Sequence, residues 1–349
     1  MCSRLVLMGL FVTAPRRILA IDGGGLKGAL PAALLAEIED RTGERIVDHF
    51  DLIAGTSTGG IIALGLALGL PAREILQFYR ERGPAIFGQE AGIATGLRKW
   101  LGRRASSLGT SARWLRRSKY SNGGLARALD DVFGDRQLGQ AETRLVIPAF
   151  DSLTSGPYVF KTAHHPRFKS DYTARVVDVA LATAAAPTFL PAHSFAGATH
   201  LVDGGVWANN PTGSAALEAA TVLRWDMDNV RLLSLGCSQV YLGPKPDAGV
   251  IDALRGKWIL NLMMEGQACF SMAAAKLLLG HPHTNPHLIR IDPQVPAGFA
   301  ALDDAEKIDQ LAGLGAAAAR KNLPELERCF LVGTRQPFVP DHQLSRKAA

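Results

Sequence analysis

The sequence predicts an α/β fold, in which helices cover a central sheet. Two observations favour it. An apolar strand, a glycine-rich loop and a helix follow one another twice between residues 17 and 82, and strand-like segments alternate with helical ones thereafter. The chain has 349 residues, 47% of them hydrophobic, which is enough for one sizeable core. We expect one domain at 16–335, between a flexible leader at 1–15 and a frayed tail at 336–349.

The first unit begins with the apolar segment RILAID at 17–22, which has the length and composition of a buried strand. The next helix is expected at 28–42, because leucine and isoleucine recur there at helical spacing and Gly43 provides the stop. The second unit consists of a strand at 50–54 and helices at 61–70 and 71–82. The later expected strands are 144–151, 158–162, 199–202 and 230–235, and the later helices are 176–183, 209–224, 251–279 and 303–322.

The long helix expected at 251–279 carries Met263, Met264 and Met272. Such a methionine stripe is typical of a hydrophobic core, and a ligand groove is the alternative. We therefore expect these methionines to be buried.

The positive charge of the chain is concentrated in one segment. The net charge is +6, yet nine basic residues and no acidic one lie between Ala91 and Leu129. We expect the part at 91–119 to be an insertion or lid that contacts anionic lipid headgroups or the phosphate of a nucleotide effector; a solvated surface loop is the alternative. The candidate contact residues are Arg98, Arg103, Arg104, Arg113, Arg116 and Arg117. No helix-turn-helix, zinc-finger or RNA-recognition pattern supports DNA or RNA as a partner.

The chain contains four cysteines, Cys2, Cys237, Cys269 and Cys329. None forms a C-x-x-C pair or lies at zinc-finger spacing, so we expect neither a disulfide scaffold nor a metal, which suits a reducing cytoplasm. The apolar run at 5–13 superficially resembles a signal peptide, but it continues into a basic pair without a good cleavage site, which favours a leader over secretion. No window reaches the ~18 consecutive apolar residues that cross a bilayer, so membrane contact is expected to be peripheral.

Ser57 is the candidate nucleophile. It stands at the centre of Gly55-Thr56-Ser57-Thr58-Gly59, a G-x-S-x-G motif between an expected strand and an expected helix. A serine on such a sharp turn needs small neighbours, which the two glycines supply. The turn also places the hydroxyl at a helix N-terminus, where the helix dipole favours developing negative charge.

The glycine-rich loop Asp22–Gly28 has two interpretations. Its G-x-G-x-x-G spacing matches a dinucleotide-binding loop, but that site needs an acidic residue at the end of the next strand, and the serine turn occupies this place. The other interpretation is an oxyanion hole, in which consecutive glycine amides point at a carbonyl oxygen and Lys27 adds positive charge nearby. We favour the oxyanion hole because the two glycine loops occur as a pair.

A serine hydroxyl needs a base to attack an ester. His193 and His200 could complete a Ser-His-Asp triad. The rival is Asp203, which ends an expected strand and precedes two glycines that allow a sharp turn. A carboxylate can act as base if it is held close and partly desolvated.

Together, the glycine loop, the serine motif and Asp203-Gly204-Gly205 resemble the patatin-like phospholipase family over residues 16–240. The resemblance implies a three-layer α/β/α domain with a mostly parallel sheet. It also implies a Ser–Asp dyad without a catalytic histidine, and release of fatty acids from glycerolipids without metal or cofactor. It assigns Ser57 as nucleophile and Asp203 as the dyad aspartate. The matching oxyanion-loop residues are Gly23, Gly24, Gly25 and Lys27.

The segments 48–70 and 159–191 are similar to bacterial phospholipases that a cyclic nucleotide activates in anti-phage defence. This resemblance implies a cyclic di- or trinucleotide activator and membrane phospholipids as substrate. It also implies a cytoplasmic enzyme that is peripheral to the inner membrane when active. We expect residues 251–280 or 91–119 to cover the acyl pocket. A lipase without nucleotide control, an oxidoreductase and a non-catalytic binding module are the alternatives. The sequence leaves the oligomeric state open, and a homo-oligomer is compatible with it.

Overall fold

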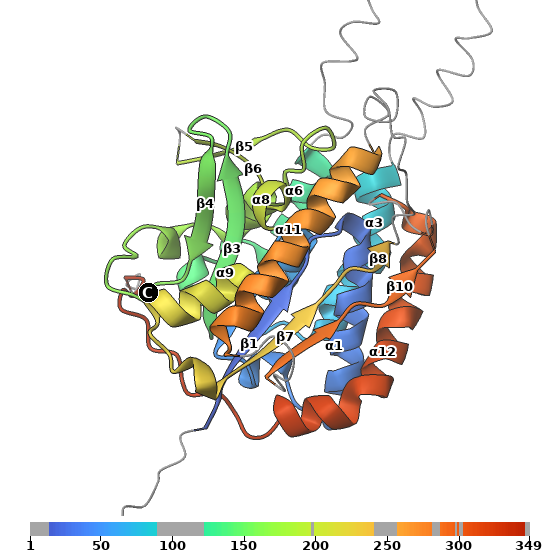
Figure 1. Ribbon diagram of the computed structural model, residues 1–349. Coiled ribbons are helices and arrows are strands. Elements are labelled where there is room, and N and C mark those ends of the chain that lie inside the picture. Colours follow the sequence, from blue (N-terminus) through green and yellow to red (C-terminus); the bar gives the residue numbers. More distant parts are fainter. Residues whose placement is uncertain are drawn as a thin grey trace, which may run out of the picture.

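The computed structural model describes residues 14–88, 122–196, 199–240, 257–280, 287–296, 299 and 303–345. An eight-stranded sheet, in the order β5-β6-β3-β2-β1-β7-β9 with β4 also paired to β3, is covered by helices on both faces (Figure 1). Its strands are β1 (Arg16–Ile21), β2 (Leu52–Gly55), β3 (Arg144–Asp151), β4 (Gly156–Lys161), β5 (His193–Phe195), β6 (Thr199–Asp203), β7 (Val230–Leu235) and β9 (Leu288–Ile291). The pairings from β3 through β2, β1 and β7 to β9 are parallel, which confirms the predicted three-layer α/β/α class.

Two helical layers enclose this sheet. One contains α1 (Ala29–Thr42), α2 (Thr58–Ala67), α3 (Ala72–Gly88), α6 (Asn122–Phe133), α7 (Val176–Ala184) and α12 (Ile308–Cys329). The other contains α9 (Thr212–Leu217) and α11 (Lys257–Leu278), with the short α8 (Gly205–Ala208) beside them. Short 3-10 helices lie at Gly25–Gly28, Ile46–Asp48, Leu138–Gln140, Asp171–Thr173, Met227–Asn229 and Ala305–Lys307, and β8 (Gln239–Val240) pairs with β10 (Gln294–Val295).

Alternation along the strands divides the core in two. Leu19 and Ile21 of β1 point into the layer that contains α1 and α12, whereas Ile18 and Ala20 point toward α9 and α11. The buried residues that α9 and α11 contribute are mostly alanines, including Ala215 and Ala275. These small side chains let both helices lie close to the sheet.

The strand order brings three loops to one place. β4 pairs with one edge of β3 from Val146 to Asp151, so β2 and β6 share the other edge, where Ala54 lies opposite Val146 and Asp203 opposite Ala149. Because β6 is antiparallel to β3, its carboxyl end points at the carboxyl end of β2. β1 ends beside β2 in parallel register. The segments that follow β1, β2 and β6 therefore meet.

Several elements differ from expectation. The helix expected at 209–224 is divided into α9 and a π-helical turn at Glu218–Val222. The prediction of a buried methionine stripe is wrong for Met263, whose exposed fraction is 65%, because α11 is a surface helix. In the segment expected to be frayed, the Asp341 amide donates to the Ala163 carbonyl (2.7 Å), and the His342 ring is hydrogen-bonded to the Pro166 carbonyl (2.8 Å). Its described part thus differs from a free tail.

Two sequence predictions lie largely or wholly outside the described residues. These are the leader at 1–15, of which only 14 and 15 are described, and the basic segment at 91–119 with its six candidate arginines. Within the described part of the chain, no helix combines the length and apolarity that a membrane span requires.

A close approach of α12 to α1 yields a stability prediction. A Cβ at Gly315 would lie 2.1 Å from the Leu30 carbonyl oxygen of α1, whereas one at Gly313 would meet no atom within 4 Å. Gly315→Ala should therefore force the helices apart and lower the free energy of unfolding by about 1–3 kcal/mol. Gly313→Ala, the matched control, should raise it by up to about 1 kcal/mol, because alanine favours a helix. Urea unfolding of both variants tests this, and equal effects would contradict it.

Candidate active site

Ser57 occupies a strained turn between β2 and α2. Its backbone angles are φ 55° and ψ −122°, in a region that a residue with a side chain rarely adopts. Neighbouring glycines make the turn possible. A Cβ at Gly55 would lie 2.1 Å from the Gly59 carbonyl oxygen, and one at Gly59 would lie 2.3 Å from the Ile21 carbonyl oxygen. The end of β1 and the start of α2 therefore press on each other around Ser57.

Hydrogen bonds from other elements hold this turn. The Ser57 amide donates to the Thr183 hydroxyl of α7 (3.0 Å), which in turn donates to the Pro148 carbonyl of β3 (2.6 Å). The Thr56 hydroxyl donates to the Ala208 carbonyl at the end of α8 (2.6 Å). Ser57 is only 9% exposed, so its hydroxyl lies below the protein surface.

The structure brings Asp203 into contact with Ser57. Asp203 ends β6 and is 5% exposed; its carboxylate is hydrogen-bonded to the Ser57 side chain and accepts the Gly205 amide at 2.7 Å. Burial raises the pKa of Asp203 to about 6, although the two hydrogen bonds act in the opposite direction. The carboxylate is therefore charged at neutral pH and more basic than an ordinary aspartate.

The glycine loop lies directly beside Ser57. A Cβ at Gly23 would be 3.2 Å from the Ser57 Cβ and 2.3 Å from the Asn209 Oδ1, so only glycine fits there. The Gly23 amide donates to the Asn209 carbonyl (2.9 Å) and is already engaged. Gly25 has a positive φ of 58°, and Lys27 is half-buried in the 3-10 helix that follows. All four predicted loop residues thus lie on the same segment as Asp22, next to the serine turn.

A buried ion-pair cluster fixes the start of the glycine loop. Arg290 of β9 reaches across Ser234 of β7 and binds both carboxylate oxygens of Asp22 (2.9 and 2.6 Å) and one of Asp292 (2.6 Å). Burial raises the pKa of Asp22 to about 6 against the effect of Arg290, and the two aspartates raise the pKa of Arg290 despite its burial. The sequence did not predict the role of Arg290, because β9 is a short, isolated segment and was not expected to be a strand.

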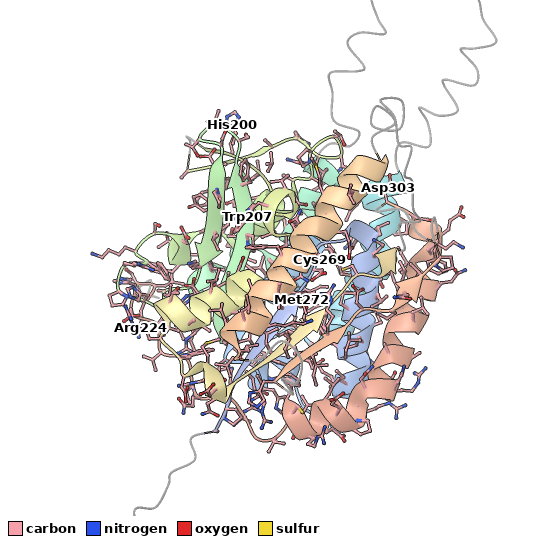
Figure 2. The ribbon with its side chains drawn as sticks, in the orientation of Figure 1. His200, Trp207, Arg224, Cys269, Met272 and Asp303 are labelled. Atoms are coloured by element: carbon pink, nitrogen blue, oxygen red, sulfur yellow. The ribbon has the colours of Figure 1, made fainter. Side chains whose placement is uncertain are left out.

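A second set of contacts ties α8 to both loops and to α11. The Asn209 Nδ2 donates to the Gly23 carbonyl (3.3 Å), and the Asn209 amide donates to the Gln267 Oε1 of α11 (2.9 Å). The Gln267 Nε2 donates to the Gly205 carbonyl (3.0 Å). Gln267 therefore holds both ends of α8, two residues from Asp203. Figure 2 labels Trp207 of α8 and Cys269 of α11 on this side of the molecule.

The histidines weighed as alternative bases have other positions. His193 Nε2 lies 3.2 Å from the Asp178 carboxylate, and His200 is an exposed residue of β6. His164 is buried against Glu218 (3.0 Å), where desolvation lowers its pKa. Among the residues that the structure describes, no cluster of histidine, cysteine and acidic side chains could hold a metal ion.

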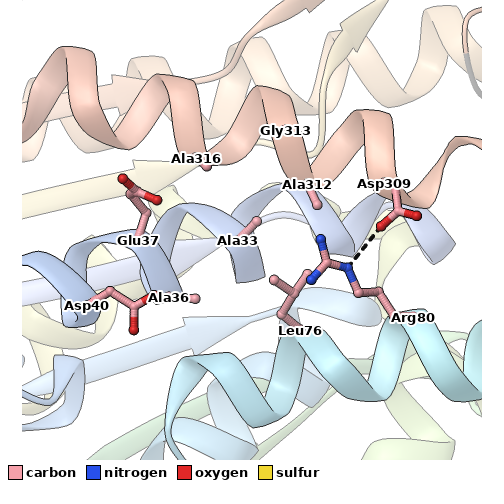
Figure 3. Close-up of a pocket in the computed structure, with 10 residues that line it drawn as sticks. All are labelled: Ala33, Ala36, Glu37, Asp40, Leu76, Arg80, Asp309, Ala312, Gly313 and Ala316. Atoms are coloured by element: carbon pink, nitrogen blue, oxygen red, sulfur yellow. Dashed lines mark hydrogen bonds and ion pairs between the residues drawn. The ribbon is translucent and has the colours of Figure 1, made fainter.

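A pocket elsewhere in the fold does not belong to this site. It lies between α1, α3 and α12, and alanines and Leu76 form much of its lining (Figure 3). Its three acidic side chains are paired: Asp309 with Arg80 (3.0 Å), Glu37 with Arg320 (3.2 Å) and Asp40 with Arg73 (2.6 Å). None of its lining residues comes from the loops that carry Ser57 or Asp203.

The model of the patatin-like phospholipase family matches residues 19–216, more than half of the chain. The chain belongs to this family. The match spans both glycine loops and Asp203, and it confirms the resemblance drawn from the three motifs. The protein is a patatin-like lipid acyl hydrolase, as the sequence predicted.

Curated relatives of this patatin-like protein come from bacteria and plants. A cGAMP-activated phospholipase of Pseudomonas aeruginosa (strain BWHPSA011 / Pa011) is 38% identical over 255 residues, which cover 72% of this chain and 71% of that protein. One of Vibrio cholerae serotype O1 is 30% identical over 326 residues, covering 86% and 89%. Patatin-like protein 2 of Oryza sativa subsp. indica is 30% identical over 361 residues, covering 89% and 85%.

In this patatin-like phospholipase, Asp203→Asn should raise stability at high pH. The folded-state pKa of Asp203, about 6, lies above the value of about 3.9 in an unfolded chain, so stability falls as the pH rises through this window. Asparagine does not ionise. The free energy of unfolding of the variant should therefore exceed that of the parent by up to about 3 kcal/mol near pH 8. Near pH 4 there should be no such gain. Urea unfolding at both pH values measures this.

Asp151→Asn is the matched control for Asp203→Asn. Asp151 accepts the Leu153 amide (2.9 Å) and the Thr154 hydroxyl (2.8 Å), and these hydrogen bonds lower its pKa. Its neutralisation should therefore reduce stability near neutral pH. Burial does not set the pKa of Asp203 if both variants gain stability, or if the gain of Asp203→Asn is the same at both pH values.

Arg290→Met should destabilise the protein strongly, because it leaves Asp22 and Asp292 buried beside each other without a cation. Removal of one partner of a buried pair typically costs about 3–5 kcal/mol. The control is Arg320→Met. Arg320 is 48% exposed beside Glu37, so this variant should lose at most about 1 kcal/mol of its free energy of unfolding. Similar small losses in both variants, measured by urea unfolding, would show that Arg290 is not structurally required.

Proposed function

We propose that this protein is a phospholipase that cleaves fatty-acyl esters of membrane phospholipids with Ser57 as nucleophile and Asp203 as base. The observation that carries the proposal is the contact between the Ser57 hydroxyl and the buried Asp203 carboxylate. A serine without a neighbouring base is a poor nucleophile. Desolvation makes this carboxylate a better base than an exposed aspartate, while it stays ionised at neutral pH.

The reaction consists of two acyl transfers. Ser57 Oγ attacks the ester carbonyl carbon and its proton passes to Asp203; the tetrahedral intermediate then collapses, and Asp203 returns the proton to the departing lysolipid alcohol. A water molecule next gives its proton to Asp203 and attacks the acyl-serine. Release of the fatty acid returns the proton to Ser57. The dyad needs no histidine, because one carboxylate carries the proton in both steps.

Backbone amides of the glycine loop stabilise the negative oxygen of each tetrahedral intermediate. Gly24 and Gly25 are the donors we favour, because the Gly23 amide is engaged with the Asn209 carbonyl. Gly23 instead provides the close approach of the loop to Ser57, and Lys27 adds positive charge on the same segment. The N-terminus of α2 lies at Ser57 and contributes its dipole in the same sense.

A cyclic nucleotide activates the enzyme in our proposal, in a bacterial defence against phage. The support is the similarity to two proteins named cGAMP-activated phospholipases, which this chain covers over 71% and 89% of their length. The plant patatin-like protein at 30% identity supports the alternative, a lipase without nucleotide control. Activation would act at the membrane, where the substrate lies. The basic segment at 91–119 remains a candidate contact for headgroup or nucleotide phosphate.

The test measures fatty-acid release from vesicles of phosphatidylethanolamine and phosphatidylglycerol, with and without cGAMP and a panel of other cyclic di- and trinucleotides. We expect one nucleotide to raise release by about tenfold or more, a typical allosteric coupling. Ser57→Ala should reduce release by at least about a thousandfold and abolish labelling by a fluorophosphonate.

His193→Ala and His200→Ala are the controls for a triad, and both should retain release and labelling. Persistence of full activity in Ser57→Ala would reject the dyad. High release that no nucleotide alters would reject the activated defence enzyme and favour the unregulated lipase.

A further inference from the structure

The outer face of α11 is apolar. Among its described side chains, four large hydrophobic ones are strongly exposed: Leu262 (48%), Met263 (65%), Phe270 (75%) and Leu277 (72%). They recur at helical spacing on one side of the helix, and the remaining exposed residues between them are Gly266, Cys269, Ala273 and Lys276. We call these four side chains the α11 apolar face. Soluble surfaces rarely gather so many large apolar groups without a partner.

A second surface helix of the same length provides a contrast. Both α11 and α12 have 22 residues, but the exposed positions of α12 include six charged residues, Asp309, Arg320, Lys321, Glu325, Glu327 and Arg328. The described exposed positions of α11 include one, the basic Lys276. The lack of charge is therefore a property of α11 and not of surface helices in this chain.

Helix α11, which carries this face, packs against the segment that follows Asp203. Gln267, on the same helix, binds the Gly205 carbonyl (3.0 Å) and the Asn209 amide (2.9 Å). Ser271 donates to the Asn210 carbonyl (2.7 Å). The neighbouring helices α8 and α9 add two more exposed hydrophobic side chains, Val206 (45%) and Leu217 (48%). Exposed apolar side chains thus also occur on α8, which begins two residues after Asp203, and on α9.

We infer that the α11 apolar face is the surface by which this protein docks on an anionic phospholipid bilayer, an inference that rests on the proposed hydrolysis of membrane phospholipids. An interfacial helix inserts its apolar side chains between the headgroups and keeps basic, not acidic, groups at the boundary. The exposed side of α11 meets both conditions, since it carries the α11 apolar face and its one exposed charge in the described part is Lys276. The acid of this helix, Glu265, is half-buried and accepts from the Cys269 thiol (3.9 Å), so it is not one of the exposed charges of the helix.

Docking through α11 also brings the active site close to the bilayer. The nucleophile and base are each exposed by less than a tenth, so a phospholipid must enter from directly adjoining surface rather than from bulk water. α11 and α8 lie on the Asp203 side of the site, because Gln267 of α11 binds the Gly205 carbonyl of α8, two residues from Asp203. A bilayer held at α11 therefore presents its lipids beside Ser57.

The experiment separates docking from catalysis. The full chain with Ser57→Ala, which cannot hydrolyse lipid, is sedimented with vesicles of phosphatidylethanolamine and phosphatidylglycerol, with and without cGAMP. Adding Met263→Gln, Phe270→Gln and Leu277→Gln should lower the vesicle-bound fraction by about tenfold or more. The matched control replaces three equally exposed hydrophobic residues elsewhere by glutamine, Leu153 (61%), Val332 (67%) and Val339 (74%), and should bind like the parent.

Hydrolysis by the enzyme with Ser57 intact gives the second readout. The α11 triple variant should lose release from vesicles by about tenfold, yet turn over a water-soluble short-chain ester within about twofold of the parent. The inference fails if the parent never binds vesicles, if both triple variants bind alike, or if soluble-ester turnover falls equally. It also fails if light scattering shows that the parent is a dimer and the α11 variant a monomer, while the variant still binds vesicles. Failure of the dyad would instead appear as ester hydrolysis that survives Ser57→Ala.

Discussion

The site depends on close contact between backbone segments that leave no room for a side chain. Gly59 lies against the Ile21 carbonyl at the end of β1, and Gly23 lies against Ser57 and Asn209. Ser57 can hold its left-handed backbone only because the structure on both sides determines it, since a serine at φ 55° is otherwise unfavourable. The parallel register of β1 and β2 supplies this constraint, because it ends both strands at the same level. The serine turn and the glycine loop are thus one packed unit.

Two buried aspartates at this unit show how the fold treats charge. Asp22 and Asp203 are both deeply buried, and burial raises the pKa of each to about 6. Asp22 receives a bidentate arginine and serves to anchor a loop. Asp203 receives only a serine hydroxyl and one backbone amide, so its charge is less compensated. Both carboxylates are thus more basic than an exposed aspartate, but the oxygens of Asp22 are engaged by the Arg290 guanidinium, whereas one partner of Asp203 is a hydroxyl that can give it a proton. The difference in partners therefore suits one aspartate to structure and the other to chemistry.

Much of this could be predicted from local sequence. Neighbouring residues in the chain identify the glycine loop, Ser57 and Asp203, because backbone turns require particular residues at fixed spacing. Arg290 and Gln267 could not be found in this way. Gln267 acts on residues 58 and 62 positions away, and Arg290 acts on Asp22 across β7, 268 positions away; neither carries a local pattern. The exposure of Met263 escaped prediction for a related reason: the hydrophobicity of α11 is visible in the sequence, but which side of the helix meets the sheet depends on tertiary packing.

The two helical layers also differ in their relation to the sheet. The layer of α1, α3 and α12 is thick, and α12 packs closely on α1 while its outer residues are charged and paired, as with Arg320 and Glu37. The layer of α9 and α11 is thin, joins the sheet mainly through alanines, and leaves four large apolar side chains of α11 outside. A helix that turns small residues inward and large ones outward buries little apolar surface in the core, although its sequence is hydrophobic. Its composition is better explained by what lies outside the protein, and the hydrogen bonds of Gln267 make it the helix through which an external surface can act on the Asp203 loop.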